Sequence, residues 1–334
     1  MTESIVKLSA GLALLLSILA SQALSQPMQV KGVGWTASTN VGPALATDGV
    51  NAYIAWVDSA TSDIYFATYT GTGWASAQTV SGTSGGKKWT AMSDATPAWG
   101  SDGTNFYLLW KGKSGNDIWF SEYSDGAWSL QAVVQGADPS WTAETDVAPA
   151  ATFESWPVTL YWKGAFGNKI WTSTFNFMSP GWTTQLVNGG PTTNVAFGVE
   201  ACPNTTGVAP LFVKPASSND IFAWLDATSF QVSGPGWKAE TTQAPAAALN
   251  LNGNDIVFWT GQTGTSIWYS YNESLPLVFL GAPVWSQQKT VTGAKTNAAP
   301  TVAEANGPSM VVALLAWKNA SDTSIWYSDV STLP

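Results

Sequence analysis

The segment LLWKGKSGNDIW, residues 108–119, has the pattern of a β-hairpin in which two tryptophans face each other. A hydrophobic run ends in Trp110, turn-forming residues that include Gly112 and Gly115 follow, and a second hydrophobic pair ends in Trp119. Antiparallel pairing that is symmetric about this turn places Trp110 opposite Trp119 on one side of a sheet. Such a cross-strand aromatic pair stabilises a hairpin by about 0.2–1 kcal/mol.

The same pair of aromatic anchors recurs along the chain. Its six copies are Trp56/Tyr65, Trp110/Trp119, Trp162/Trp171, Phe212/Phe222, Trp259/Trp268 and Trp317/Trp326. The two aromatics are nine residues apart in five copies and ten apart in the fourth, and the copies follow at intervals of 47 to 58 residues. This is the length of a four-stranded blade. The sequence therefore predicts an all-β fold, a six-bladed β-propeller in which each anchor pair joins strands b and c of one blade.

Two further signals mark the other strands of each blade. The innermost strand a is predicted to begin near Pro43, Pro97, Pro149, Pro245 and Pro300, and the small residues that follow suit the crowded ring axis. The outermost strand d is predicted to end in Val-x-Gly. This signature occurs at Val80/Gly82, Val134/Gly136, Val187/Gly189, Val232/Gly234 and Val291/Gly293.

The sixth copy of Val-x-Gly stands near the N-terminus, at Val30 and Gly32, whereas only eight residues follow Trp326 at the other end of the chain. We therefore predict that residues 26–33 pair with strand c of the last blade, around Ile325–Asp329. In this arrangement the N-terminal strand closes the ring and removes the open sheet edges.

The first residues have the pattern of a secretory signal peptide. Lys7 precedes an apolar run of about a dozen residues, and small residues follow at Ala23 and Ser25. We predict that residues 1–25 are a signal peptide, that residues 26–334 are the propeller, and that the mature protein is secreted and extracellular.

Composition restricts the partners and the chemistry. The net charge is −9 and all 13 basic residues are lysines, which is unfavourable for binding nucleic acid or inserting into an anionic membrane surface. The chain contains neither His nor Arg, so His-activated nucleophiles, the commonest metal ligand and bidentate anion clamps are all missing. Cys202 is the single cysteine, which excludes an intramolecular disulfide and favours a role as a small buried residue. We predict no cofactor and assign no metal-ligating residues, because no loop shows alternating Asp and Asn at the spacing of an EF-hand, although Asp- and Asn-rich turns leave calcium binding open.

A second tryptophan series lies in the connections between strand d of one blade and strand a of the next. Trp35, Trp89, Trp141 and Trp237 each stand eight residues before a proline that opens strand a; three read Trp-Thr-Ala and the fourth Trp-Lys-Ala. These connections and the b–c turns lie on the same face of the disk, so each of these tryptophans is predicted to approach the Trp-Lys pair that ends the next strand b. The predicted ligand sites are Trp89 with Trp110, Lys111 and Asp117 in the second blade, and Trp141 with Trp162, Lys163 and Asn168 in the third.

A flat indole beside an amine and a carboxylate or amide is typical of a sugar site, because pyranose C–H groups stack on aromatic rings while hydroxyls take directed hydrogen bonds. Packing between blades is the alternative role for these rings. On the sequence alone, packing is favoured for the strand tryptophans, and the two roles are evenly balanced for the connection tryptophans.

An enzymatic role receives less support. A glycosidase needs two carboxylates at a set separation, and 22 acidic residues allow many pairs, but no acid belongs to a repeated catalytic motif. Sialidase-type catalysis uses an arginine cluster to hold the substrate carboxylate, and the absence of Arg excludes it. We predict no catalytic residues and no enzymatic activity.

The six Trp- and Gly-rich units in residues 26–334 resemble those of six-bladed propeller lectins, including the fucose-binding group. This resemblance implies shallow sugar pockets between neighbouring blades and glycans or glycoproteins as partners. The fucose-binding group reads its sugar with Arg, Glu and Trp, and because this chain has no Arg the resemblance does not extend to fucose as the ligand. Two function classes follow: a secreted lectin-like protein with several shallow sites on one face, and a non-catalytic extracellular protein–protein interaction scaffold.

Overall fold

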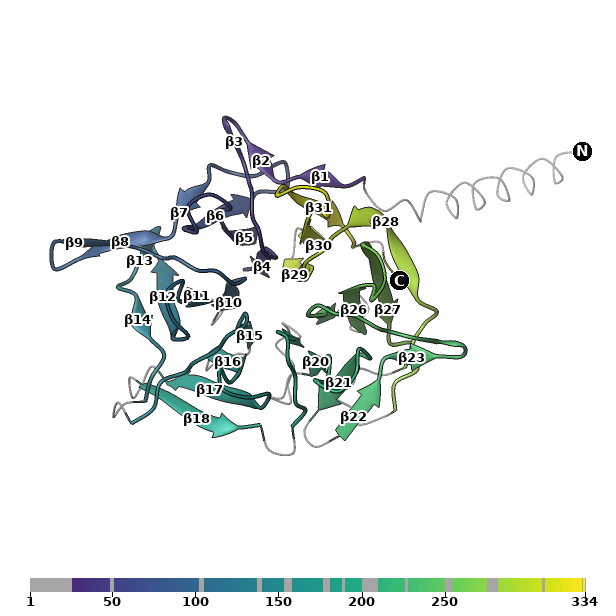
Figure 1. The fold of residues 1–334 in the computed structure, drawn as a ribbon. Coiled ribbons are helices and arrows are strands. Elements are labelled where there is room, and N and C mark those ends of the chain that lie inside the picture. The colour runs from purple at the N-terminus through teal and green to yellow at the C-terminus, as the bar shows by residue number, and fades with distance from the viewer. Residues whose placement is uncertain are drawn as a thin grey trace, which may run out of the picture.

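The computed structural model describes residues 26–48, 51–101, 105–136, 140–152, 158–176, 181–187, 190–199, 210–225, 228–249, 254–274, 282–307, 310–331 and 333. These residues form six small antiparallel sheets arranged as a ring, which confirms the six-bladed β-propeller (Figure 1). Residues 1–25, Gly189 and Cys202 lie outside the described residues, and the signal peptide stays a prediction. Within the described residues, no helix is long and apolar enough to cross a bilayer.

Each of the first three blades follows the predicted order from the axis outward. Blade 1 contains β4 Ala44–Thr47, β5 Ala52–Val57, β6 Ile64–Tyr69 and β7 Gln78–Thr79; blade 2 contains β10 Ala98–Ser101, β11 Phe106–Lys111 and β12 Ile118–Ser124, with β13 Ala127–Trp128 and β14 Ala132–Val133 both paired to β12; blade 3 contains β15 Ala150–Thr152, β16 Val158–Lys163, β17 Ile170–Asn176 and β18 Gly181–Leu186.

The last three blades repeat this order, and blade 6 takes its outer strand from the other end of the chain. Blade 4 contains β19 Gly198–Val199, β20 Leu211–Val213, β21 Phe222–Leu225 and β22 Thr228–Gln231; blade 5 contains β25 Ala246–Leu249, β26 Asp255–Thr260, β27 Ser266–Tyr271 and β28 Lys289–Lys295; blade 6 contains β29 Thr301–Gly307, β30 Met310–Lys318, β31 Ile325–Asp329 and β1 Met28–Gln29.

The predicted anchor hairpins have the expected register in five blades. Trp110 is paired with Trp119, and the equivalent aromatics of blades 1, 3, 5 and 6 are paired in the same way. In blade 4 the additional residue in the turn shifts the register. Phe222 therefore lies opposite Val213 instead of Phe212.

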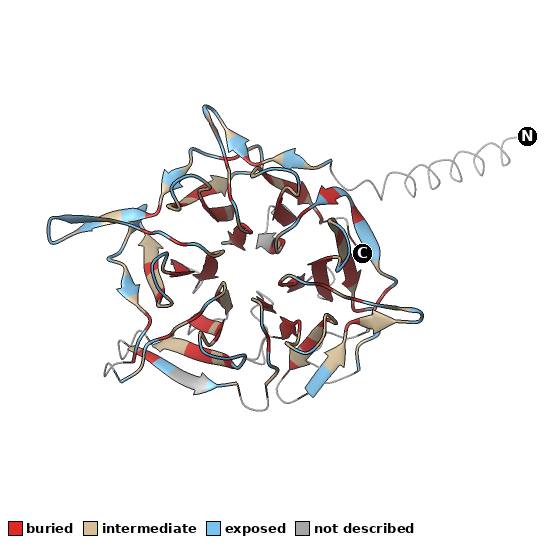
Figure 2. Ribbon diagram, viewed as in Figure 1, coloured by how far each residue is buried: buried red, intermediate tan, exposed pale blue. Residues whose placement is uncertain are grey.

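The hydrophobic core consists of layers between adjacent blades. The layer between blades 1 and 2 includes Ile64, Leu108 and Trp110, all nearly or completely buried. Buried residues concentrate on the inner and middle strands, while the outer strands carry most of the exposed positions (Figure 2). Burial of aliphatic and aromatic side chains in these layers is the main stabilising contribution in a chain that relies on strand pairing and packing.

The ring is closed as predicted. Met28 and Gln29 pair with Tyr327 and Trp326, and the N–H of Val30 donates to the carbonyl of Ile325 at 2.8 Å. The side chain of Val30 is completely buried in the layer between blades 6 and 1. The closing strand is shorter than the predicted residues 26–33, because the chain turns away after Val30.

Three of the connections form outward hairpins, which the sequence did not predict. They are β2 Lys31–Gly32 with β3 Trp35–Thr36, β8 Ser81–Ser84 with β9 Lys87–Thr90, and β23 Ser233–Gly234 with β24 Trp237–Lys238 (Figure 1). In these three connections the valine of Val-x-Gly directly follows strand d and its glycine belongs to the hairpin, whereas in blade 5 strand β28 continues through Val291 and Gly293. Three of the four connection tryptophans therefore lie in short strands, and their expected position outside the strands is wrong.

Candidate functional site

The b–c turns and the d-to-a connections meet on one face of the disk, and their backbones are joined in the same way at all six junctions. A turn N–H of each blade donates to the carbonyl of the preceding connection at 3.0–3.1 Å. These bonds are Ser59 to Ser38, Lys113 to Met92, Ala165 to Glu144, Ala216 to Thr192, Gln262 to Glu240 and Ala320 to Lys295. The repeated bonds fix the side chains of the connections at defined places between neighbouring blades.

A ring of buried hydroxyls supports the connections. Its members, all with no exposed surface, are Thr39, Ser93, Thr145, Thr193, Thr241 and Thr296. Each hydroxyl accepts a hydrogen bond from the backbone N–H two residues further on, at 3.0–3.2 Å. Sequence reasoning missed this ring, although a Thr or Ser stands four residues after each of the four connection tryptophans.

The connection tryptophans pack into columns of aromatic rings. Trp35 stacks on Trp56 with ring centroids 5.7 Å apart, and Trp237 stacks on Trp259 at 6.5 Å. This confirms the predicted approach to the next strand b for Trp35 and Trp237. A methyl group on Gly82 would lie 2.7 Å from Nε1 of Trp89, so the indole of Trp89 rests directly on that glycine.

In blade 2 the structure divides the predicted site residues between two places. Trp89 is half-buried and packs in the same hydrophobic layer as the buried Trp110. Neighbouring residues in a strand point to opposite faces, so Lys111 is directed away from these rings and is itself buried. Asp117 is half-buried, and its backbone is paired with Glu144 of the next connection. Contact of these four residues with a sugar stays a prediction.

Blade 3 has the same arrangement. Trp141 is half-buried beside the buried Trp162, while Lys163 is buried on the opposite face of the strand. The side chain of Asn168 is exposed on the b–c turn, and its carbonyl accepts the N–H of Thr193 at 2.8 Å. As in blade 2, the four predicted site residues of blade 3 do not meet at one place. Their role in binding also stays a prediction.

The lysines that end strand b are held by side chains of their own blade. The contacts, each from Nζ to a side-chain oxygen, are Lys111–Asp94 at 2.7 Å, Lys163–Asp146 at 2.6 Å, Lys214–Asn194 at 2.8 Å and Lys318–Asn297 at 2.9 Å. Burial lowers the pKa of Lys214, whose partner is a neutral amide. Asp94, Asn194 and Asn297 line the cavity on the ring axis, so the lysines support its mouth.

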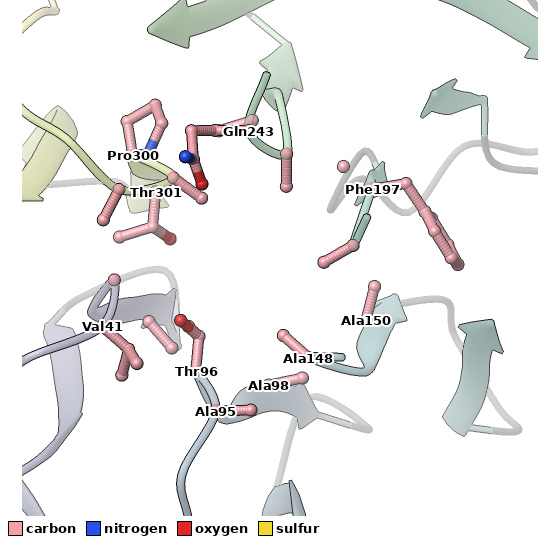
Figure 3. Close-up of a pocket in the computed structure, with 18 of the residues that line it drawn as sticks. Val41, Ala95, Thr96, Ala98, Ala148, Ala150, Phe197, Gln243, Pro300 and Thr301 are labelled. Atoms are coloured by element: carbon pink, nitrogen blue, oxygen red, sulfur yellow. The ribbon is translucent and has the colours of Figure 1, made fainter. Parts of the chain in front are cut away.

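The axial cavity has a volume of about 450 Å³ and is bounded by the first residues of the innermost strands. Small apolar side chains such as Ala98 and Ala150 form much of its wall. Gln243 extends toward Pro300 and Thr301, while the ring of Phe197 points away from the centre (Figure 3). The wall offers few groups that could orient a polar ligand.

Two junctions carry a pair of facing carboxylates. Asp220 lies opposite Glu240 between blades 4 and 5, and Asp117 lies opposite Glu144 between blades 2 and 3. Lys238 bridges the first pair, with Nζ 2.8 Å from Asp220 and 3.0 Å from Glu240. The hydrogen bonds that its ammonium donates to Asp220 and Glu240 raise the pKa of Lys238.

No set of residues suited to a metal ion is present among the described residues, since no three His, Cys, Asp or Glu side chains gather there. The site is therefore a set of surface junctions whose chemistry is aromatic rings, hydroxyls, amides and carboxylates.

No family model matches the chain, and no curated protein matches it. Among solved structures, the SapL1 lectin in complex with alpha methyl fucoside aligns with a TM-score of 0.58 and 13% identity over 87% of this chain and 93% of that chain. The Hadza microbial sialidase Hz136 aligns with a TM-score of 0.57 and 13% identity over 91% of this chain and 68% of that chain. A luciferin-regenerating enzyme aligns with a TM-score of 0.49 and 10% identity over 91% and 95% of the two chains.

These identities establish a shared fold and nothing finer. The similarity confirms that the chain is arranged like a propeller lectin. A sialidase has the same arrangement, so the fold by itself is compatible with both a binding protein and an enzyme. The chain thus shares its propeller fold with a lectin solved in complex with a fucoside and with a sialidase.

Proposed function

We propose that this chain is a secreted carbohydrate-binding protein with several shallow sugar sites on the face that carries the b–c turns and connections. The observation that supports the proposal is the repetition, around that face, of half-buried aromatic rings beside polar side chains. The strand-c rings Trp119, Trp171, Trp268 and Trp326 are all half-buried. An aromatic ring with nearby hydrogen-bonding groups suits a sugar, which has both apolar and hydroxyl surfaces.

Of the residues predicted from the sequence, we propose the accessible ones as sugar contacts. They are Trp89, Asp117, Trp141 and Asn168, whereas the buried strand-b tryptophans and lysines would position them. Each such site is expected to be weak, with a millimolar dissociation constant corresponding to about 4 kcal/mol. Several sites on one face would then strengthen binding to a multivalent glycan.

A glycan array probed with the protein beginning at Gln26 tests this proposal. Binding to one or more glycans is expected, and the signal should fall when monovalent sugar is added as a competitor. Absence of binding across the array would overturn the proposal.

We further propose that the protein does not catalyse glycoside hydrolysis. The missing His and Arg and the lack of a patterned carboxylate pair on the cavity wall support this. Purified protein should release no product above buffer from a panel of aryl glycosides and sialosides, and turnover of any of them would refute the proposal.

A protein–protein interaction scaffold is the second candidate. The outward hairpins favour it, because they project from the rim (Figure 1) and Val33 at the tip of one is fully exposed. This candidate predicts a negative glycan array together with loss of partner binding when a hairpin is shortened.

A further inference from the structure

The junction between blades 2 and 3 repeats the junction between blades 4 and 5 almost bond for bond. In the first, Ile118 donates to Ala143 at 2.9 Å and Ala143 to Val134 at 2.8 Å. In the second, Ile221 donates to Ala239 at 2.9 Å and Ala239 to Val232 at 2.9 Å. The backbone positions of the two junctions can therefore be compared residue by residue.

The comparison places the two carboxylate pairs in equivalent positions. Asp117 and Glu144 form an antiparallel bridge, as Asp220 and Glu240 do. In both junctions the glutamate carbonyl accepts a turn N–H of the next blade at 3.0 Å. Both pairs bring two negative charges to facing positions, which destabilises the fold unless a cation lies near them.

The two junctions differ in the residue that supplies this cation. Lys238 stands two residues before Glu240 and contacts both carboxylates, whereas the same position before Glu144 is occupied by Thr142. Within the described residues, neither Asp117 nor Glu144 forms an ion pair with a lysine. The junction of blades 2 and 3 thus has the two carboxylates that bind an ammonium between blades 4 and 5, but no lysine among the described residues pairs with them.

Aromatic residues stand close in the chain to this carboxylate pair. Trp119 is two residues from Asp117 in extended backbone, so their side chains lie on the same face, and the half-buried ring of Trp119 packs against the layer between blades 1 and 2. Phe166 follows the residue whose N–H is bonded to Glu144, and its side chain is almost completely exposed. Aromatic rings next to carboxylates can hold an apolar sugar face and a charged substituent together.

We propose that the junction of blades 2 and 3 binds an amino sugar, a glucosamine-type unit whose free ammonium occupies the position that Lys238 Nζ occupies between blades 4 and 5. This inference rests on the proposed carbohydrate-binding function and specifies its ligand at one junction. The ammonium donates to Asp117 and Glu144, and the ring of Trp119 contacts the sugar.

Titration calorimetry with a glucosamine hexasaccharide and its fully N-acetylated counterpart tests the proposal. The wild-type protein is expected to bind the free amine at least about tenfold more tightly, because acetylation removes the charge. High salt should reduce the preference. The variant Thr142→Lys should abolish it by placing an internal ammonium between the carboxylates.

The chain offers two matched variants. Thr90→Lys makes the same substitution in the connection where Met92 replaces the glutamate, and it should leave the preference for the free amine intact. Lys238→Thr frees the second carboxylate pair and should add a second amine site, measured as increased stoichiometry.

Three outcomes would overturn the inference. They are equal binding of the two hexasaccharides, a preference that survives Thr142→Lys, and competition by Nα-acetyl-lysine amide as strong as that by glucosamine. Neutral glycans bound on the array without any preference for glucosamine would refute this inference alone. Absence of binding to every glycan and to both hexasaccharides would refute the proposed function with it.

Discussion

Replacing Val30 by alanine measures what closure of the ring contributes to stability. The side chain of Val30 has no exposed surface and lies in the hydrophobic layer between the last and first blades. Val33, three residues further along, is fully exposed at the tip of a hairpin and provides a matched control. Val30→Ala removes two buried methyl groups and leaves a cavity, so we expect the free energy of unfolding to fall by about 2–3 kcal/mol. Val33→Ala should change it by less than about 0.5 kcal/mol.

Deleting residues 26–30 extends this test to the strand itself. The deletion removes the pairing of Met28 and Gln29 with strand c of blade 6 as well as the Val30 side chain, so its effect should exceed that of Val30→Ala. It also leaves the edge of that strand unpaired, and we expect dimers or aggregates in size-exclusion chromatography. Urea denaturation followed by tryptophan fluorescence gives the free energies. Equal unfolding midpoints for the two valine variants would refute the closure argument, as would a deletion variant as stable as the parent.

Three further predictions address the aromatic columns and the pH dependence. Gly82→Ala should destabilise the protein by about 1–3 kcal/mol in urea denaturation, because its methyl group would overlap the rigid indole of Trp89; Gly73→Ala, with open space around it, should not. Burial raises the pKa of Tyr327 to about 12, so the folded protein retains a proton that the unfolded chain loses above about pH 10. Stability should therefore fall between pH 10 and 12, and Tyr327→Phe should weaken that fall when unfolding is measured across this range. Replacing both Trp89 and Trp141 by alanine should lower the melting temperature as well as glycan binding, since each half-buried ring contributes about 2–4 kcal/mol of packing; an unchanged melt would assign them to the ligand alone.

The fold was predictable because its main signals are periodic and local. The spacing of Trp110 and Trp119 requires a symmetric hairpin, and six copies of that spacing leave few alternatives to a ring of blades. The position of Val30 predicted ring closure for the same reason, since its repeat partner was missing at the C-terminus. The outward hairpins were not predicted, because only some repeats have counterparts of Gly82 and Trp89. The contact between these two residues also depends on how the two short strands fold back on each other.

The site was harder to predict, and Lys111 shows why. Trp110 and Lys111 are adjacent in the sequence, but a strand directs adjacent side chains to opposite faces, so only the tryptophan packs in the hydrophobic layer with Trp89. The ion-pair partner of Lys111 was also hidden, because Asp94 reaches the lysine only through its position at the mouth of the axial cavity. The partner of Asp117 was equally hidden, because Glu144 meets it only through the pairing of the connection with the outer edge of strand c.

Comparison among the six repeats separates structural charges from charges that are free for a ligand. Where strand b does not end in lysine, the facing position at the cavity mouth has no carboxylate either: Val57 accompanies Asn40 in blade 1, and Thr260 accompanies Thr242 in blade 5. In blades 4 and 6 the lysine stays and contacts a neutral amide, so at this position a carboxylate is present only where a lysine can pair with it. At the junction of blades 2 and 3 the carboxylates remain although the lysine is absent. This departure from the rule is the reason to assign that pair to a cation from outside the chain.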